Sequence, residues 1–150
     1  MTEFDNSLLH KAAESGDLEV IQYCLDLGLD EHAVTSKNTN MVQKASFKKL
    51  EALKFFLDRG HDPYHVNMEG DNAIVIAAER GKLKIIRYLY ENYRLSLFAA
   101  DRERTTAYEL ARKNKYAKVT EYLEEISAEN WENRKALLSL RYSMKAKSYN

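Results

Sequence analysis

Residues 7–30 read SLLHKAAESGDLEVIQYCLDLGLD, and this stretch decides the fold because variants of it return three more times along the chain. One alanine marks each copy, at spacings of 33, 32 and 34 residues: Ala12, Ala45, Ala77 and Ala111. A near-constant period of this length is typical of stacked structural repeats. The sequence therefore predicts one repeat domain over residues 1–127, with units at about 2–34, 35–66, 67–100 and 101–127.

Each unit is expected to hold two helices joined by a polar turn. The residues that open the first helix all have side chains that cap helix N-termini: Ser7, Asn40, Asn72 and Thr106. Thr106 with Glu109 makes a capping box, and Asn40 with Gln43 makes a looser one. The second helix carries apolar residues at i, i+3, i+6 and i+7, as a half-buried helix requires. Left-handed C-caps are expected at Gly28 and Gly60, with Tyr93 and Ser127 in their place in the later copies.

One column of the second helices is aromatic in every copy: Tyr23, Phe55, Tyr88 and Tyr122. Equivalent residues of stacked repeats lie next to one another, so we interpret this column as a ladder that joins the second helices. An exposed aromatic strip for a partner is the alternative. The single cysteine, Cys24, stands in the next column with Phe56, Leu89 and Leu123, which predicts a small core residue rather than a nucleophile or a ligand.

Read together, these residues resemble the ankyrin repeat. The resemblance covers about residues 2–127, and it is closest in the first copy and weakest in the second, which has lost one residue near Lys49. It implies an all-α solenoid of helix pairs, joined by hairpin loops that project sideways and make a concave face. It also implies that His10 ties neighbouring loops by hydrogen bonds. Asp5 and Arg104 hold hairpin positions where glycine is usual, so those turns are expected to be looser or differently shaped.

Residues 128–150 do not match the repeat. Trp131, Leu137, Leu138, Leu140 and Tyr142 give an apolar face to a last helix, and no acidic residue follows Glu132. One interpretation is a helix that covers the open apolar end of the fourth copy, because a terminal repeat needs a cap. The other is a docking helix with a basic tail that contacts another protein or an anionic surface.

The sequence carries no pattern that indicates catalysis. Phosphate-binding and nucleophile-elbow motifs are absent, and the carboxylates alternate with basic residues as on a solvated surface. His61 and His65 have the i, i+4 spacing, but Gly60 and Pro63 place them on a loop. We therefore expect no enzyme activity, no cofactor and no metal site.

The family geometry leaves the hairpin tips and the two positions after the alanine pair free to face a partner. Phe4, Phe47 and Met68 stand out there, because exposed apolar side chains at such places are candidate binding anchors. The full set of candidate contacts, with one from the tail, is Phe4, Asn6, Ser15, Lys37, Thr39, Phe47, Lys48, Met68, Glu69, Asp71, Arg80, Arg102, Glu103, Thr105, Lys113, Asn114 and Trp131.

Composition restricts the class of partner. Lysine plus arginine equal aspartate plus glutamate at 23 each, so no global field steers nucleic acid to the chain, and a protein partner is expected instead. No apolar run is long enough to span a bilayer, and the N-terminus does not resemble a secretory signal, so we expect a monomeric cytoplasmic protein, with the nucleus or a host cytosol also open. The predicted function is a protein-binding adaptor or scaffold. The alternatives are an inhibitory subunit that occludes an enzyme, as ankyrin-type kinase inhibitors do, and a pathogen effector acting on host proteins.

Overall fold

The computed structural model describes residues 3–148, without the side chains of residues 3–5, 133, 134, 137, 141 and 148. The described chain is helical, with one isolated antiparallel bridge between Ala100 and Thr106. The helices are α1 (Glu3–Ser15), α2 (Leu18–Asp26), α3 (Met41–Ala45), α4 (Leu50–Asp58), α5 (Ala73–Glu79), α6 (Leu83–Tyr93), α7 (Ala107–Lys113) and α8 (Ala117–Ser148). None of the helices described within residues 3–148 combines the length and apolar character needed to cross a membrane.

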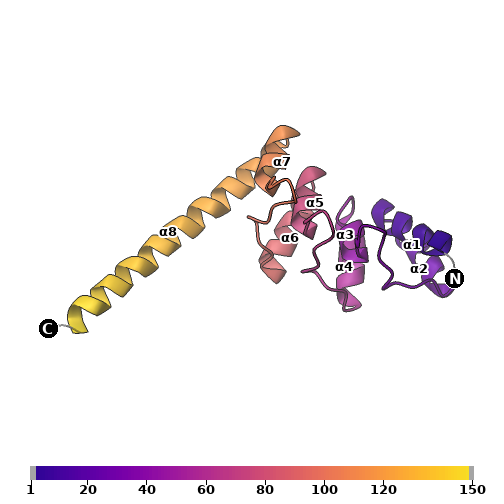
Figure 1. The fold of residues 1–150 in the computed structure, drawn as a ribbon, viewed down its shortest axis with the longest axis horizontal. Helices are drawn as coiled ribbons and strands as arrows, with labels where there is room; N and C mark the ends of the chain where they lie inside the picture. The colour runs from indigo at the N-terminus through magenta and orange to yellow at the C-terminus, as the bar shows by residue number, and fades with distance from the viewer. Residues whose placement is uncertain (1–2, 149–150) are drawn as a thin grey trace.

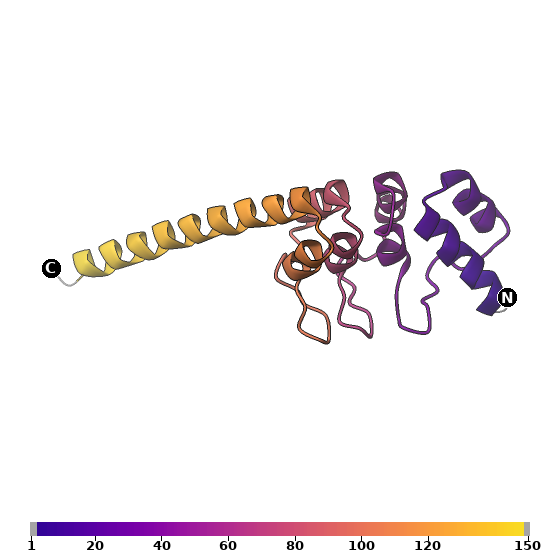
Figure 2. The ribbon, with the colours of Figure 1, turned by 90° about the horizontal axis from the view of Figure 1, so that it is seen from above.

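The helices pair and stack as the repeat pattern predicts. Each odd-numbered helix contacts the even-numbered helix that follows it, and the first helices α1, α3, α5 and α7 contact one another in order along the stack. The loops before α3, α5 and α7 project to the same side of the stack (Figure 2). The predicted all-α solenoid is therefore confirmed for the described chain.

Small residues allow the first helices to approach closely. Ala45, Ala77 and Ala111 are fully buried, and Ala12 is 4% exposed. The core is completed by larger apolar side chains from both layers, among them Leu9, Ile21, Leu53, Phe56, Ile74, Ile86, Leu89 and Leu123. Cys24 is fully buried within this core, and burial raises the pKa of its thiol. The thiol is therefore held in its neutral form, as expected of a small core residue.

Three of the four predicted N-caps are confirmed. The side chains of Asn40, Asn72 and Thr106 accept hydrogen bonds from the backbone N–H three residues on, and Asn40 and Thr106 complete capping boxes. The prediction for Ser7 is wrong, because α1 begins at Glu3 and Ser7 lies inside it. Asp5 accordingly lies in a helix instead of a hairpin. In the described residues α1 runs through the positions that correspond to the hairpin end and the N-cap of the later units.

The ends of the second helices agree with the glycine pattern only in the first two copies. Gly28 and Gly60 adopt left-handed φ values of 81° and 89° directly after α2 and α4. In the third copy Arg94, and not Tyr93, takes the left-handed C-cap with φ 53°. Ser127 does not end a helix at all, since α8 continues through it to Ser148.

The aromatic column joins the repeats, but not ring to ring. Lys54 of α4 lies over the ring of Tyr88 at 5.0 Å, and Arg87 of α6 lies over the ring of Tyr122 at 5.0 Å. None of the ring–ring contacts found among the described side chains pairs two members of the column, and Tyr23 is 62% exposed. The column is thus linked by cation–π contacts. The lysine or arginine that precedes one aromatic residue in the sequence lies over the aromatic ring of the following unit.

Helix α8 begins in the core and then leaves the stack (Figure 1). Val119 and Leu123, each 2% exposed, pack with the fourth unit, whereas Trp131, Leu138, Leu140, Tyr142 and Met144 are between 49% and 78% exposed. The helix therefore crosses residue 127 without interruption, and the structure does not lay these side chains over the end of the stack. Phe98 at that end is 66% exposed and lines an apolar depression with Leu97, Tyr108 and Leu123.

Candidate functional site

Many of the candidate contacts lie on the hairpins of the second, third and fourth units (residues 35–39, 67–71 and 101–105), called the second, third and fourth hairpins after their units. Each hairpin is closed by the same backbone hydrogen bond, from the N–H of Thr35, Asn67 or Asp101 to the carbonyl four residues on. Adjacent tips are joined in turn: the Met68 N–H donates to the Lys37 carbonyl at 2.9 Å, and the Arg102 N–H donates to the Glu69 carbonyl at 2.7 Å. The row of tips is therefore continuous across units two to four.

Side chains inside the stack hold these hairpins in place. His10, at 6% exposure, lies with its Nε2 3.0 Å from the Ala33 carbonyl, which confirms the predicted tie between neighbouring loops. Gln43 occupies the equivalent column in the second unit and is 1% exposed. Its amide donates to the carbonyls of His65 at 3.1 Å and Asp71 at 2.8 Å, and its Oε1 accepts from the Asn40 N–H at 3.1 Å. One glutamine thus fixes both the start of α3 and the third hairpin.

A basic groove follows the turns between the paired helices. It is lined by Lys11, Glu14, Ser15, Phe47, Lys48, Arg80, Lys82 and Tyr116. Phe47 is half-buried, with the Arg80 guanidinium 4.5 Å and the Lys44 ammonium 5.1 Å from its ring centre. Lys44 also forms an ion pair with Glu14 at 3.0 Å, which neutralises the acid in the lining. The remaining cations therefore give the groove a positive field around an aromatic floor.

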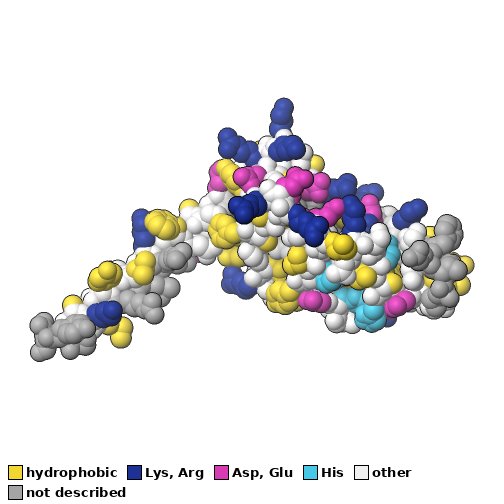
Figure 3. Space-filling view, in the orientation of Figure 1, with side chains coloured by type: hydrophobic (Ala, Val, Ile, Leu, Met, Phe, Trp, Pro, Cys, Tyr) yellow, Lys and Arg dark blue, Asp and Glu magenta, His cyan; other side chains and the backbone are white. Residues whose placement is uncertain are grey.

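An acidic pocket lies between the third and fourth hairpins. It is lined by Glu69, Asp71, Glu79, Asp101, Arg102, Glu103 and Leu110. Burial, reinforced by the neighbouring Glu69 and Asp101 carboxylates, raises the pKa of Asp71 to about 6. Lys37 forms an ion pair with Glu69 at the rim. Acidic and basic side chains lie close together over this part of the stack in Figure 3. The charged residues that line the groove are mostly basic and those that line the pocket are mostly acidic, so the surface holds two regions of opposite charge.

The structure brings eight of the seventeen predicted contacts into these two regions. Ser15, Phe47, Lys48 and Arg80 line the basic groove, and four others line the acidic pocket: Glu69, Asp71, Arg102 and Glu103. Met68 lies beside them at 52% exposure. Asn6 lines a third depression with His10 and Lys44, and its Oδ1 is buried without a hydrogen-bond partner among the described atoms. These positions converge as the repeat geometry implied.

Some predicted contacts lie elsewhere. Thr39 is only 7% exposed and accepts a hydrogen bond from Asn67, so we correct its expected role to a structural one. The Thr105 N–H donates to the Asp101 side chain, and Asn114 donates to the Glu79 carbonyl at 3.4 Å beside an exposed Lys113. Trp131 lies on α8 and is 57% exposed. The Phe4 side chain lies outside the described residues.

Sequence reasoning missed three groove residues, Lys11, Lys82 and Tyr116. Tyr116 packs so closely against Gly81 that a Cβ built on that glycine would lie 2.7 Å from the ring. A comparable contact places Lys49 against Gly16. The signal was present in the columns, since the residue directly before the second helix of one unit (Tyr116 or Lys49) covers the glycine in the turn of an earlier unit.

Comparisons with known proteins agree with this architecture. Two toxins of Latrodectus tredecimguttatus align with 108 residues of the chain, Alpha-latroinsectotoxin-Lt1a at 29% identity and Alpha-latrocrustotoxin-Lt1a at 25%. Each alignment covers 71% of this chain but only 8% of the toxin, so the chain spans a small fraction of the length of these relatives.

The family models cover nearly the whole stack. The model for ankyrin repeats in three copies matches residues 40–133, and the model for a single ankyrin repeat matches residues 4–33. Members of this family are in general protein–protein interaction modules and are typically non-catalytic. With matches over most of its length and four stacked helix pairs, the chain belongs to the ankyrin repeat family.

Proposed function

We propose that this protein is an adaptor or scaffold that holds a partner protein across the hairpin tips and the basic groove. The observation that carries the proposal is the pairing of two oppositely charged regions on one continuous surface. A partner protein can match both signs with different segments, whereas a nucleic-acid backbone would be repelled by the acidic pocket. The apolar side chains of Phe47 and Met68, near the charges, supply the contact area that hot spots need.

The proposal is tested by capturing partners from cell extract with matched charge variants. Lys48→Glu with Lys82→Glu reverses part of the basic groove, and Glu79→Lys with Glu103→Lys reverses part of the acidic pocket. The control, Glu51→Lys with Asp58→Lys, makes the same kind of change on exposed residues of α4. We expect each site variant to lose partners, as scored by quantitative mass spectrometry, that the control retains.

Circular dichroism melts show whether every variant is folded. Folded site variants that recover the wild-type partners in wild-type amounts would refute the proposed surface. Loss of the same partners in the control would place binding on the second helices instead.

A further inference from the structure

We propose that Glu31, His32 and His61 form a binding site for a divalent cation of the zinc class. The three residues come from successive units: Glu31 and His32 follow α2, and His61 follows α4. One ligand atom from each lies within 4.8 Å of the other two. Two imidazoles and one carboxylate are a donor set that zinc uses in proteins, with solvent or a further ligand in the fourth position.

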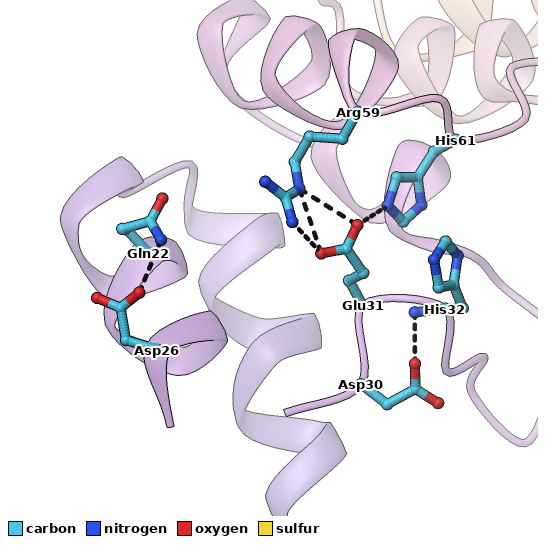
Figure 4. Close-up of polar contacts among 7 residues, drawn as sticks. All are labelled: Gln22, Asp26, Asp30, Glu31, His32, Arg59 and His61. Carbon is cyan, nitrogen blue, oxygen red and sulfur yellow. Dashed lines mark hydrogen bonds and ion pairs between the residues drawn. The ribbon is translucent and has the colours of Figure 1, made fainter. Parts of the chain in front are cut away.

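The expectation of no metal site came from the spacing of the histidines along the sequence. His32 and His61 are 29 residues apart, and no helical ligand spacing joins them. The repeat period brings them together, because the loop after one second helix lies against the loop after the next. Figure 4 shows Glu31 between Arg59 and His61, with His32 beside His61.

One of the three ligand-atom distances is already near that of a tetrahedral site. His61 Nε2 lies 3.0 Å from Glu31 Oε1, with a hydrogen bond between them. With metal–ligand bonds of about 2.0–2.1 Å, tetrahedral ligand atoms are about 3.3 Å apart, so this pair needs little movement. His32 has to turn, because its ring is stacked on that of His61 at 4.8 Å and 16°, and parallel rings do not aim their lone pairs at one point. His32 is exposed, which leaves room for that rotation.

The surroundings hold two of the ligands in place. His61 is 8% exposed, its ring meets Phe56 edge to face at 5.3 Å, and its backbone N–H donates to the Phe56 carbonyl. Arg59 donates to both Glu31 oxygens, with its shortest bond, 2.5 Å, to Oε2. A cation on Oε1 leaves Oε2 to Arg59, which would orient the carboxylate as outer partners of metal ligands do.

Occupancy of this site would tie the first unit to the second at an edge separate from the surface proposed for partner binding. None of the three ligands lines the basic groove or the acidic pocket. A cation that binds only the folded chain raises its stability by RT ln(1 + [M]/Kd). The inference does not depend on the proposed function.

The test is isothermal titration calorimetry of the tag-free full chain with zinc chloride, next to thermal melts with and without zinc. We expect one ion per chain and a higher melting temperature with zinc. His32→Ala and Glu31→Gln should each weaken binding at least about tenfold and abolish the thermal shift, by analogy with the effect of disturbing metal sites. Both residues are outside the buried core, so these variants are expected to fold.

His65→Gln is the matched control. His65 lies on the same side of the second unit, with its Nε2 2.6 Å from the Asn38 carbonyl, and a glutamine can donate to that carbonyl in its place. Binding should be unchanged in this variant. The proposal is overturned if the wild type shows no saturable zinc binding, if His32→Ala binds as the wild type does, or if one ion joins two chains in analytical ultracentrifugation.

Discussion

Replacing Gln43 by leucine should loosen the third hairpin and destabilise the whole stack. The side chain is 1% exposed and makes three hydrogen bonds, to the carbonyls of His65 and Asp71 and from the Asn40 N–H. Leucine fills a similar volume but makes none of them. The change therefore isolates the polar role of the residue from its packing.

The magnitude follows from which groups are left without a partner. The Asp71 carbonyl still accepts from the Asn67 N–H at 3.1 Å, so it keeps one bond. The His65 carbonyl and the Asn40 N–H lose the bonds described above, and an unsatisfied buried group costs about 1–3 kcal/mol. Leucine returns about 1 kcal/mol through its burial. Two such groups together cost about 2–6 kcal/mol, so we expect a net loss of about 1–5 kcal/mol in the free energy of unfolding, a measurable part of the roughly 5–15 kcal/mol typical of a domain.

The assay is urea unfolding followed by circular dichroism, with hydrogen exchange to locate the effect. Gln22→Leu is the matched control, because Gln22 is exposed and its side chain donates to Asp26 at 2.9 Å on the surface; this variant should stay within about 0.5 kcal/mol of the wild type. Faster exchange in Gln43→Leu should centre on the Asn67 and Asp71 amides. A stability loss below about 0.5 kcal/mol, or exchange that rises equally in all units, would refute the reasoning.

Three further predictions concern a turn, a carboxyl group and the tail. Gly81→Ala should lower the free energy of unfolding by about 1–2 kcal/mol because of its left-handed backbone, and by more because the new Cβ displaces Tyr116. Gly60→Ala should show only the backbone effect, since no described atom beyond its neighbours in the chain lies within 4 Å of its Cβ position. Equal losses of stability in denaturant unfolding would contradict this prediction. The pKa of Asp71 is about 6 in the folded chain, against an ordinary value of 3.8. Between these two values the folded state keeps a proton that the unfolded state releases. The contribution of this carboxyl group to the free energy of unfolding therefore falls as the pH rises from about 4 to about 6. Asp71→Asn should therefore gain stability relative to the wild type at pH 7 but not at pH 4, in unfolding curves at both values. Trp131, the single tryptophan, should be quenched by iodide in the native protein almost as fully as in urea, and a protected Trp131 would restore the capping interpretation.

The fold could be predicted because each unit repeats the same local signals. Asn40, Asn72 and Thr106 each satisfy the orphan N–H groups of a helix start, so three independent residues placed the first helices. The predicted cap at Ser7 was wrong because α1 begins at Glu3, so the backbone N–H groups near Ser7 lie inside a helix that is already formed. The prediction of a C-cap at Ser127 was wrong because the sequence after it favours further helix over a turn, and α8 continues to Ser148.

The candidate surface was only partly accessible from the sequence. Family geometry assigned Phe47 and Arg80 to neighbouring units, but not the packing of the guanidinium on the ring at 4.5 Å. Thr39 looked like a tip residue because its position projects in the repeat pattern, and the hydrogen bond from Asn67 that draws it inward joins residues 28 apart. The Glu31, His32 and His61 cluster likewise depends on contacts between units. Equivalent positions in the repeats predict which residues are neighbours. Whether neighbouring side chains form hydrogen bonds or ring contacts depends on their conformations, which the sequence pattern does not give.

Because α8 is one continuous helix, a small rotation at its start produces a large displacement at its end. The helix is 32 residues long, about 48 Å at about 1.5 Å per residue, and its first turns are anchored by Val119 and Leu123. About 32 Å of the helix lies beyond residue 127, so a tilt of about 5° at that point would move the far end by about 3 Å. Because a rigid helix transmits rotation without bending at a joint, a partner that grips the far turns applies torque directly to the core of the fourth unit. The stiffness of that core therefore sets how far the tip can swing.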